Sequence, residues 1–255
     1  MLILTCSSKL QLLERVLRKG LPETMLVVKD NRDYYANLHA AFYREEDACR
    51  TLLENKDAVD WDKAFQLQGL QDGLYQAVKV MAEARSVHME PHFYQAMLNP
   101  DAATLCQNQL RSDPLHLGTL NPSHAALLND TYEFGGNDRS LRYLRSLIED
   151  FPNACLLDQK GQLVAWSLSD ALGCLTHGYA LPEFRGKGYM KTVMQALARK
   201  LHTKDFALYT RVRSENEISK QHLRGQGFHL LPWTKYVLFF HSKSHETAGA
   251  AFKFL

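Results

Sequence analysis

The segment LPEFRGKGYMKTVMQALARK, residues 181–200, constrains the fold of this 255-residue chain more than any other stretch. A strand-like apolar run ends at its proline, two glycines and two basic residues follow, and apolar residues then recur at helical spacing. This order predicts a strand, a basic turn and an amphipathic helix that begins near Tyr189. The first amide groups of such a helix lack internal partners and attract phosphate. The turn therefore predicts an anion site, although an ordinary turn with two solvated charges would have the same residues.

The length and composition allow a substantial core in two domains, because the chain has 255 residues and 45% of them are hydrophobic. Thirty basic and 28 acidic residues leave a net charge of +2, and no basic run is interleaved with aromatic residues, so nucleic acid is not expected as a partner. No window approaches the about 18 apolar residues of a membrane span. Neither a disulfide framework nor a metal site is expected from the scattered cysteines Cys6, Cys49, Cys106, Cys155 and Cys174.

The first twenty residues leave the compartment open, because they are basic and allow two interpretations. Leucines at helical spacing, a serine cap at Ser7 or Ser8 and a stop at Gly20 predict a structural helix. The same residues could form an organelle transit peptide.

The remaining elements follow from hydrophobic periodicity. The pattern predicts helices over residues 34–55 and 61–84, a linker over about 90–122, and two helical stretches over 122–150 around the loop 133–138. It then predicts a hairpin over 154–168 with its turn at 158–161, and a strand over 174–181 that enters the basic turn. After the helix come a strand over 206–212, a helix over 217–225, and strands over 228–231 and 236–240. This order is typical of an α/β fold.

The basic turn matches neither of two common nucleotide loops, the P-loop and the dinucleotide-binding fingerprint. It resembles instead the acyl-CoA loop of the GNAT superfamily, [QR]-x-x-G-x-[GA], at Arg185, Gly188 and Met190. Met190 departs from the pattern at the last position, which puts the tightest turn of the pyrophosphate cradle in question.

A second GNAT pattern follows at the separation that the superfamily requires. Asn216, Ser219, Gly227 and Phe228 match N-x-x-[AS]-x-x-x-x-x-x-x-G-F. Many members carry a tyrosine four residues before that glycine, where it can protonate the departing thiolate, and here Leu223 stands at that position. Protonation of the leaving group by that route is therefore not expected.

Longer segments narrow the resemblance to one family. HAALLNDTYEFGGNDRSLRYLRSLIEDFPNACLL and HGYALPEFRGKGY are similar to the glycine N-acyltransferase family and its like-protein paralogues, most of all the like-protein 3 group. MLILTCSSKLQLLERVLRKGLPE and VDWDKAFQLQGLQDGLY resemble the family's amino-terminal domain, which is internally shortened here after Glu23.

The resemblance implies a GNAT acyl-CoA-binding fold in the carboxy-terminal half, with a smaller helix-rich amino-terminal domain. The domains expected are residues 1–115, 116–245 and a tail over 246–255. It also implies a mitochondrial location, with a cytoplasmic one as the alternative, and leaves the oligomeric state open.

The resemblance implies acyl-CoA as co-substrate, without a metal, and a set of residues that contact it. The backbone of Tyr179, Ala180 and Leu181 would pair with the pantetheine arm, and Asn216 with Ser219 would contact the far arm of the cofactor. The pyrophosphate would be held by Arg185, Gly186, Lys187, Gly188, Tyr189 and Met190.

The implied reaction is direct attack of an amino group on the thioester, which needs a general base because an ammonium must first lose a proton. The family's glutamate base falls at Cys174, so the expected carboxylate is absent. Cys174 could act only as a stabilised thiolate and is otherwise a small core residue. The reference pKa of His177 suits proton abstraction near neutral pH. Side chains alternate along a strand, however, so Cys174 and His177 point to opposite faces of the sheet unless Gly173 or Gly178 creates a bulge.

Other polar residues are weaker candidates. Asp170, Glu133 and Asp138 are expected to be solvated, whereas Asn137 and Arg139 could bind an amino-acid carboxylate. The favoured function is an acyl-CoA:amino-acid N-acyltransferase that acts first on glycine. The alternative is an acyl-CoA-binding protein that has lost catalysis with the glutamate.

Overall fold

The computed structural model describes residues 38–101, 103, 105, 115–133 and 135–241. The described residues divide into two compact units, one of residues 38–93 and 233–241 and the other of those within 94–232. The helix predicted over the first twenty residues and the shortening after Glu23 lie outside the described residues. None of the helices in the described part is long and apolar enough to cross a membrane.

The first unit packs two helices, α2 (Glu46–Glu54) and α3 (Asp72–Ala84), with strands β1 (Leu38–Ala40), β2 (Phe65–Gly69) and the end of β9 (His229–His241). β1 pairs with β2 in parallel, and β2 pairs with β9 in antiparallel fashion. The rings of Phe65 and Phe240 stack with centroids 4.3 Å apart, and Trp61 meets both rings edge-on.

Several elements differ from the sequence prediction. The helices expected over 34–55 and 61–84 each give way to a strand in their first part, because β1 and β2 are held by pairing with each other and with β9. The linker expected from residue 90 is wrong over β3 (His88–Asn99), whose residues Gln95–Asn99 pair with β8, away from Pro91. The two strands expected at the end are the single strand β9.

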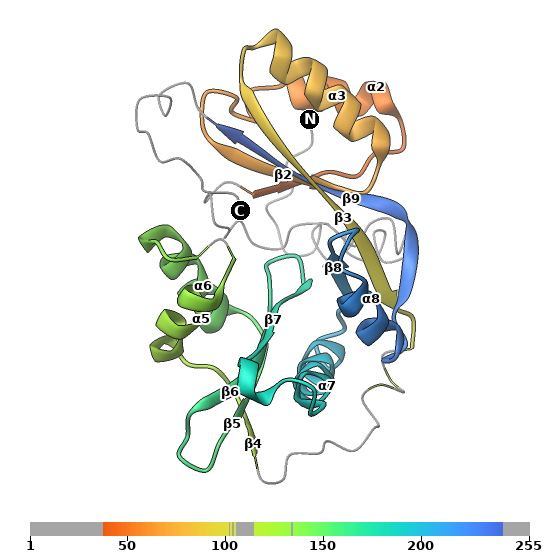
Figure 1. The fold of residues 1–255 in the computed structure, drawn as a ribbon. Helices are drawn as coiled ribbons and strands as arrows, with labels where there is room; N and C mark the ends of the chain where they lie inside the picture. The colour runs from red at the N-terminus through yellow and green to blue at the C-terminus, as the bar shows by residue number, and fades with distance from the viewer. Residues whose placement is uncertain (1–37, 102, 104, 106–114, 134, 242–255) are drawn as a thin grey trace. The chain divides into compact units, whose positions relative to one another are not determined.

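The second unit contains strands in the order β3-β8-β7-β6-β5-β4, with helices on both faces (Figure 1). Its strands are β4 (His116–Gly118), β5 (Asn153–Leu157), β6 (Leu163–Ser169), β7 (Leu175–Ala180) and β8 (Leu208–Val212). Its helices are η1 (Pro122–His124), α5 (Ala125–Thr131), α6 (Asp138–Asp150), η2 (Pro182–Phe184), α7 (Tyr189–His202) and α8 (Glu217–Arg224). The hairpin β5–β6 and the helices α5 to α8 confirm the sequence prediction for this part of the chain.

The two faces of this sheet have separate cores. Ala154 and Leu156 of β5 pack with α7, and Cys155 between them packs with α5 and α6. This alternation is what a strand covered on both faces requires. Each face of β7 can therefore be identified by the core that its residues join.

A β-bulge in β7 changes which face its side chains reach. Ser167 of β6 lies opposite two residues of β7, because the register runs from Leu168↔Thr176 to Trp166↔Tyr179. His177 in this interval has a φ of +50°, which non-glycine residues seldom adopt. Leu175 and Ala180 consequently both join the α7 core although they are an odd number of residues apart.

β7 and β8 run parallel, and their ladder among the described residues consists of the pair Leu175↔Thr210. Beyond that pair both strands continue, to Ala180 and Val212, without pairing with each other. The edge of β7 that faces β8 therefore lacks a strand partner beyond Leu175, although the carbonyl oxygen of Ala180 on that edge accepts a hydrogen bond from Nε of Arg185.

Gly173, in the turn that leads into β7, should tolerate a side chain poorly. Its φ is +76°, and an added Cβ would lie 2.7 Å from Cδ1 of Phe206. Gly161 has a φ of +79° with no described atom within 4 Å of such a Cβ. Gly161→Ala should therefore lower the free energy of unfolding by about 1 kcal/mol, and Gly173→Ala by about 1–3 kcal/mol more. Urea unfolding measures the difference, and equal losses would contradict this account of the turn.

Candidate active site

The predicted anion loop is an open turn at the amino-terminal end of α7. Gly186 and Gly188 have φ values of +75° and +81°, and no described atom lies within 4 Å of a Cβ built on either. Gly188 is the N-cap of α7, so the first amide groups of that helix face this open turn. The loop therefore has the space and the donors that an anion needs.

The basic side chains of the loop are exposed and rest on aromatic rings. Arg185 donates from Nε to the carbonyl oxygen of Ala180 at 3.0 Å, and its guanidinium lies 5.2 Å from the ring centre of Tyr179. The ammonium of Lys187 lies 5.3 Å from the ring centre of Phe184. These contacts place two cations at the end of β7.

The remaining predicted cofactor contacts on β7 and α7 lie together. Tyr179 and Ala180 pair with β6, and the N–H of Leu181 donates to the carbonyl oxygen of Val164 at 3.0 Å. Met190, the departure from the loop pattern, packs over Gly178, where an added Cβ would lie 3.2 Å from its Cε. Met190 thus covers the bulge.

The second GNAT pattern has clear structural roles. Asn216 caps α8 by accepting a hydrogen bond from the N–H of Ser219 at 3.0 Å. Gly227 has a φ of +85° and approaches Asn99 of β3, whereas Leu223 and Phe228 are buried in the α7 core. Leu223 cannot supply a proton, as expected from the sequence, and contact of Asn216 or Ser219 with a cofactor remains a prediction.

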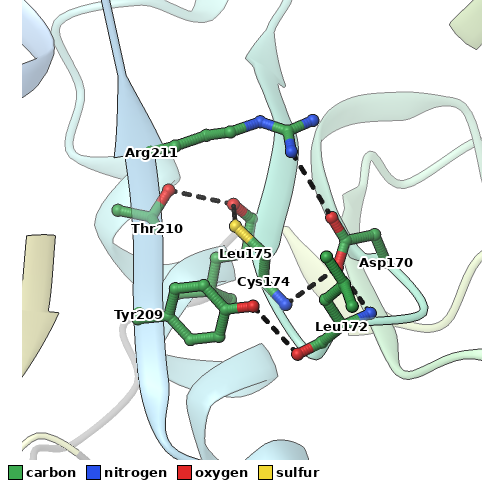
Figure 2. A network of polar contacts seen from close by, with 7 residues as sticks. All are labelled: Asp170, Leu172, Cys174, Leu175, Tyr209, Thr210 and Arg211. Carbon is green, nitrogen blue, oxygen red and sulfur yellow. Dashed lines mark hydrogen bonds and ion pairs between the residues drawn. The ribbon is translucent and has the colours of Figure 1, made fainter. Parts of the chain in front are cut away.

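Cys174 is fully buried in the turn between β6 and β7. Its Sγ lies 3.5 Å from the carbonyl oxygen of Leu175, and its N–H donates to Oδ1 of Asp170 at 3.0 Å (Figure 2). Cys49, Cys155 and Cys174 all carry thiols. Burial of Cys174 agrees with its alternative interpretation as a small core residue.

Asp170 is buried, so the prediction that it is solvated is wrong. Its Oδ1 accepts hydrogen bonds from the N–H groups of Leu172 and Cys174, both at 3.0 Å. The turn into β7 needs an acceptor for these two buried donors, and the carboxylate supplies it. Oδ2 of Asp170 faces Arg211.

His177 lies on the α6 face of β7 because of the bulge. Its ring meets Tyr132 at 4.4 Å and Tyr143 at 5.9 Å between centroids. Burial, and to a smaller extent the charge of Arg211, together lower the pKa of His177 to about 3. The imidazole is therefore neutral at physiological pH and can accept a hydrogen bond, but it is a weak base.

Arg211 of β8 is the functional candidate that sequence reasoning missed. Its Nη1 lies 3.7 Å from Oδ2 of Asp170, and its guanidinium lies 5.5 Å from the ring centre of Tyr94. Nη1 is buried and has no hydrogen-bond partner among the described residues. Burial opposes its charge, but the neighbouring Cys174 and Asp170 raise its pKa, so Arg211 stays protonated. The arginine within the predicted strand FALYTRV was the available sequence signal.

Asn137 and Arg139 lie at the start of α6, and carboxylate binding by either residue stays a prediction. Asn137 caps α6 by accepting from the N–H of Ser140 at 2.9 Å, and Arg139 is exposed. Glu133 and Asp138 are exposed, as predicted, and Glu133 forms an ion pair with Arg213 at 2.6 Å. No group of three or more His, Cys, Asp or Glu side chains suited to a metal ion occurs within the described ranges.

The parallel strands β7 and β8 part beside an open loop at the amino terminus of α7, and the family whose model matches this chain is one of acyl-CoA-dependent transferases. The chain belongs to the family described as aralkyl acyl-CoA:amino acid N-acyltransferase. Residues 26–152 match the family itself, and residues 154–237 match its C-terminal region.

Individual relatives agree with this membership. Human glycine N-acyltransferase-like protein 1 is 30% identical over 78% of this chain and 72% of that protein. Human glycine N-acyltransferase-like protein 2 is 28% identical over 91% of this chain and 95% of that protein, and bovine glycine N-phenylacetyltransferase is 26% identical over 82% and 88%. The X-ray structure of a Drosophila protein shares the fold at a TM-score of 0.61 and 18% identity, covering 71% of this chain and 62% of that one.

The depressed pKa of His177 should make stability fall with acid. The unfolded imidazole takes up a proton near pH 6.5, whereas the folded one does so only near pH 3. Below about pH 6.5, the free energy of unfolding of the wild type should fall more steeply than that of His177→Asn, by up to about 1.4 kcal/mol per pH unit. Asparagine is chosen because it tolerates the same positive φ. Urea unfolding between pH 7 and pH 5 compares the two slopes. Parallel slopes would show that the pKa of His177 is not lowered in the folded protein.

Proposed function

We propose that this protein transfers an acyl group from acyl-CoA to the amino group of an amino acid, with glycine as the first candidate. The observation that carries the proposal is the separation of β7 from β8 after the pair Leu175↔Thr210. It leaves an unpaired edge of β7 that leads directly to the anion loop at Gly188. An extended amide chain that ends in a diphosphate would fit that order of groups.

The proposed reaction has one nucleophile and no covalent intermediate on the protein. The amine nitrogen attacks the thioester carbonyl carbon, a C–N bond forms, and the C–S bond breaks. One proton leaves the attacking ammonium before attack and one leaves the nitrogen afterwards, and one of these two is taken up by the departing thiolate. The products are the N-acyl amino acid, free CoA and one proton.

His177 is the proposed acceptor of the first proton, directly or through one water. It is neutral at physiological pH and half-buried, whereas Cys174 is fully buried. A neutral imidazole has a lone pair for the ammonium proton. Its low pKa makes it a weaker base than a glutamate whose pKa is raised toward neutrality.

The second candidate function, acyl-CoA binding without turnover, is favoured by that same weakness. Cys174 occupies the position of the glutamate that the family resemblance implies, and the carboxylate that contacts it, Asp170, already accepts two backbone hydrogen bonds. The open edge of β7 and the anion loop would serve a binding protein equally well.

Thiol release from a series of acyl-CoAs, short to long, with glycine or glutamine as acceptor, separates these functions. We expect acceptor-dependent release by the wild type and a loss of about a hundredfold or more in His177→Ala. His116→Ala, which removes an exposed histidine of β4, should leave the rate unchanged.

The outcome with Cys174→Glu distinguishes the alternatives further. Release that is absent in the wild type and present only in Cys174→Glu would overturn the proposed enzyme and establish an acyl-CoA-binding protein. Release by the wild type that His177→Ala leaves unchanged would keep the enzyme and remove His177 from its mechanism.

A further inference from the structure

We infer that Arg211 binds the carboxylate of the acceptor amino acid, and that this residue makes the site select amino acids over uncharged amines. The inference rests on the proposed function and extends it by assigning the group that recognises the acceptor.

Arg211 lies beside the place where acyl transfer would occur. It follows Thr210, the last β8 residue that pairs with β7, so its side chain leaves the sheet where the two strands begin to part. Tyr209, on the same face as Arg211, donates its hydroxyl to the carbonyl oxygen of Leu172 at 2.9 Å and fixes this end of β8 (Figure 2).

The guanidinium is held in place, but its hydrogen-bonding capacity is not used up. Tyr94 covers one side of it, and Oδ2 of Asp170 lies 3.7 Å from Nη1, too far for a hydrogen bond. Oδ1 of Asp170 is already occupied by two backbone N–H groups. A planar fork with an unsatisfied buried N–H is the donor that best fits a carboxylate with two oxygens.

The charges around Arg211 match a zwitterion. The carboxylate of the acceptor would meet Arg211, and its ammonium would meet the neutral imidazole of His177 on the same face. Acceptor binding would also neutralise the guanidinium, which is one of the two causes that lower the pKa of His177. The imidazole would then be a better proton acceptor when an amino acid is bound than when the site is empty.

The test compares glycine with glycinamide, which has the same attacking amine and no carboxylate. The wild type should use glycine with a higher kcat/KM than glycinamide, and Arg211→Met should lose about tenfold to a hundredfold with glycine and little with glycinamide. Arg211→Lys keeps the charge beside Asp170 and should lose part of the preference. Arg224→Met, which removes an exposed arginine of α8, should keep all of it.

Binding of glycine to the CoA-loaded protein, measured by saturation-transfer NMR, separates this inference from the proposed function. Glycine binding that Arg211→Met and Arg211→Lys weaken supports the inference even if the wild type transfers no acyl group. The inference is overturned, even if the wild type is active, when both variants keep the preference for glycine over glycinamide or bind glycine as tightly as the wild type does. An unchanged KM for acyl-CoA in each variant establishes that the fold is retained.

Discussion

The one-residue bulge in β7 is the constraint on which the rest of the site depends. Without it, His177 would point into the α7 core, and Leu175 and Ala180 could not both pack there. With it, His177 reaches the face that carries Tyr143 and Arg211. The positive φ of His177 costs about 1–2 kcal/mol, and pairing of β7 with β6 on both sides of the bulge offsets it.

The electrostatics of the site follow from this geometry. A protonated arginine and a neutral histidine share one side of the sheet, with a buried carboxylate whose first oxygen is used by the turn before β7. Arg211 is the cation that lies beside Asp170 and lowers the pKa of His177, so an anionic acceptor group would bind there on the proposed function. On the proposed function the site would supply a proton acceptor and a carboxylate-binding group in a chain that has Cys174 where the family resemblance implies a glutamate.

Much of the second unit could be predicted from the sequence because its signals are local. Asp158 accepts backbone hydrogen bonds in the β5–β6 turn, Asn137 and Asn216 cap helices, and Gly188 starts α7, and each of these roles is set by residues a few positions away. The first unit could not be predicted as well, since FQLQG in β2 becomes a strand by pairing with β9 near the other end of the chain.

The candidate site could be predicted in part for the same reason. The anion loop is a contiguous pattern, and the possibility of a bulge could be derived from alternation along one strand. Arg211 could not be found in this way, because its significance comes from Asp170 in a distant turn and Tyr94 on another strand. The burial of Asp170 was missed because its two hydrogen bonds belong to a turn geometry that its sequence, SDALGC, does not specify.

A crystal structure of the protein with CoA and an N-acylglycine bound tests the central claim most directly. The pantetheine amides should pair with the edge of β7 beyond Leu175, the diphosphate should lie at Gly186 and Gly188, and the carboxylate should contact Arg211. A ladder between β7 and β8 that closes past Leu175↔Thr210, or a carboxylate bound at Arg139 instead, would contradict it.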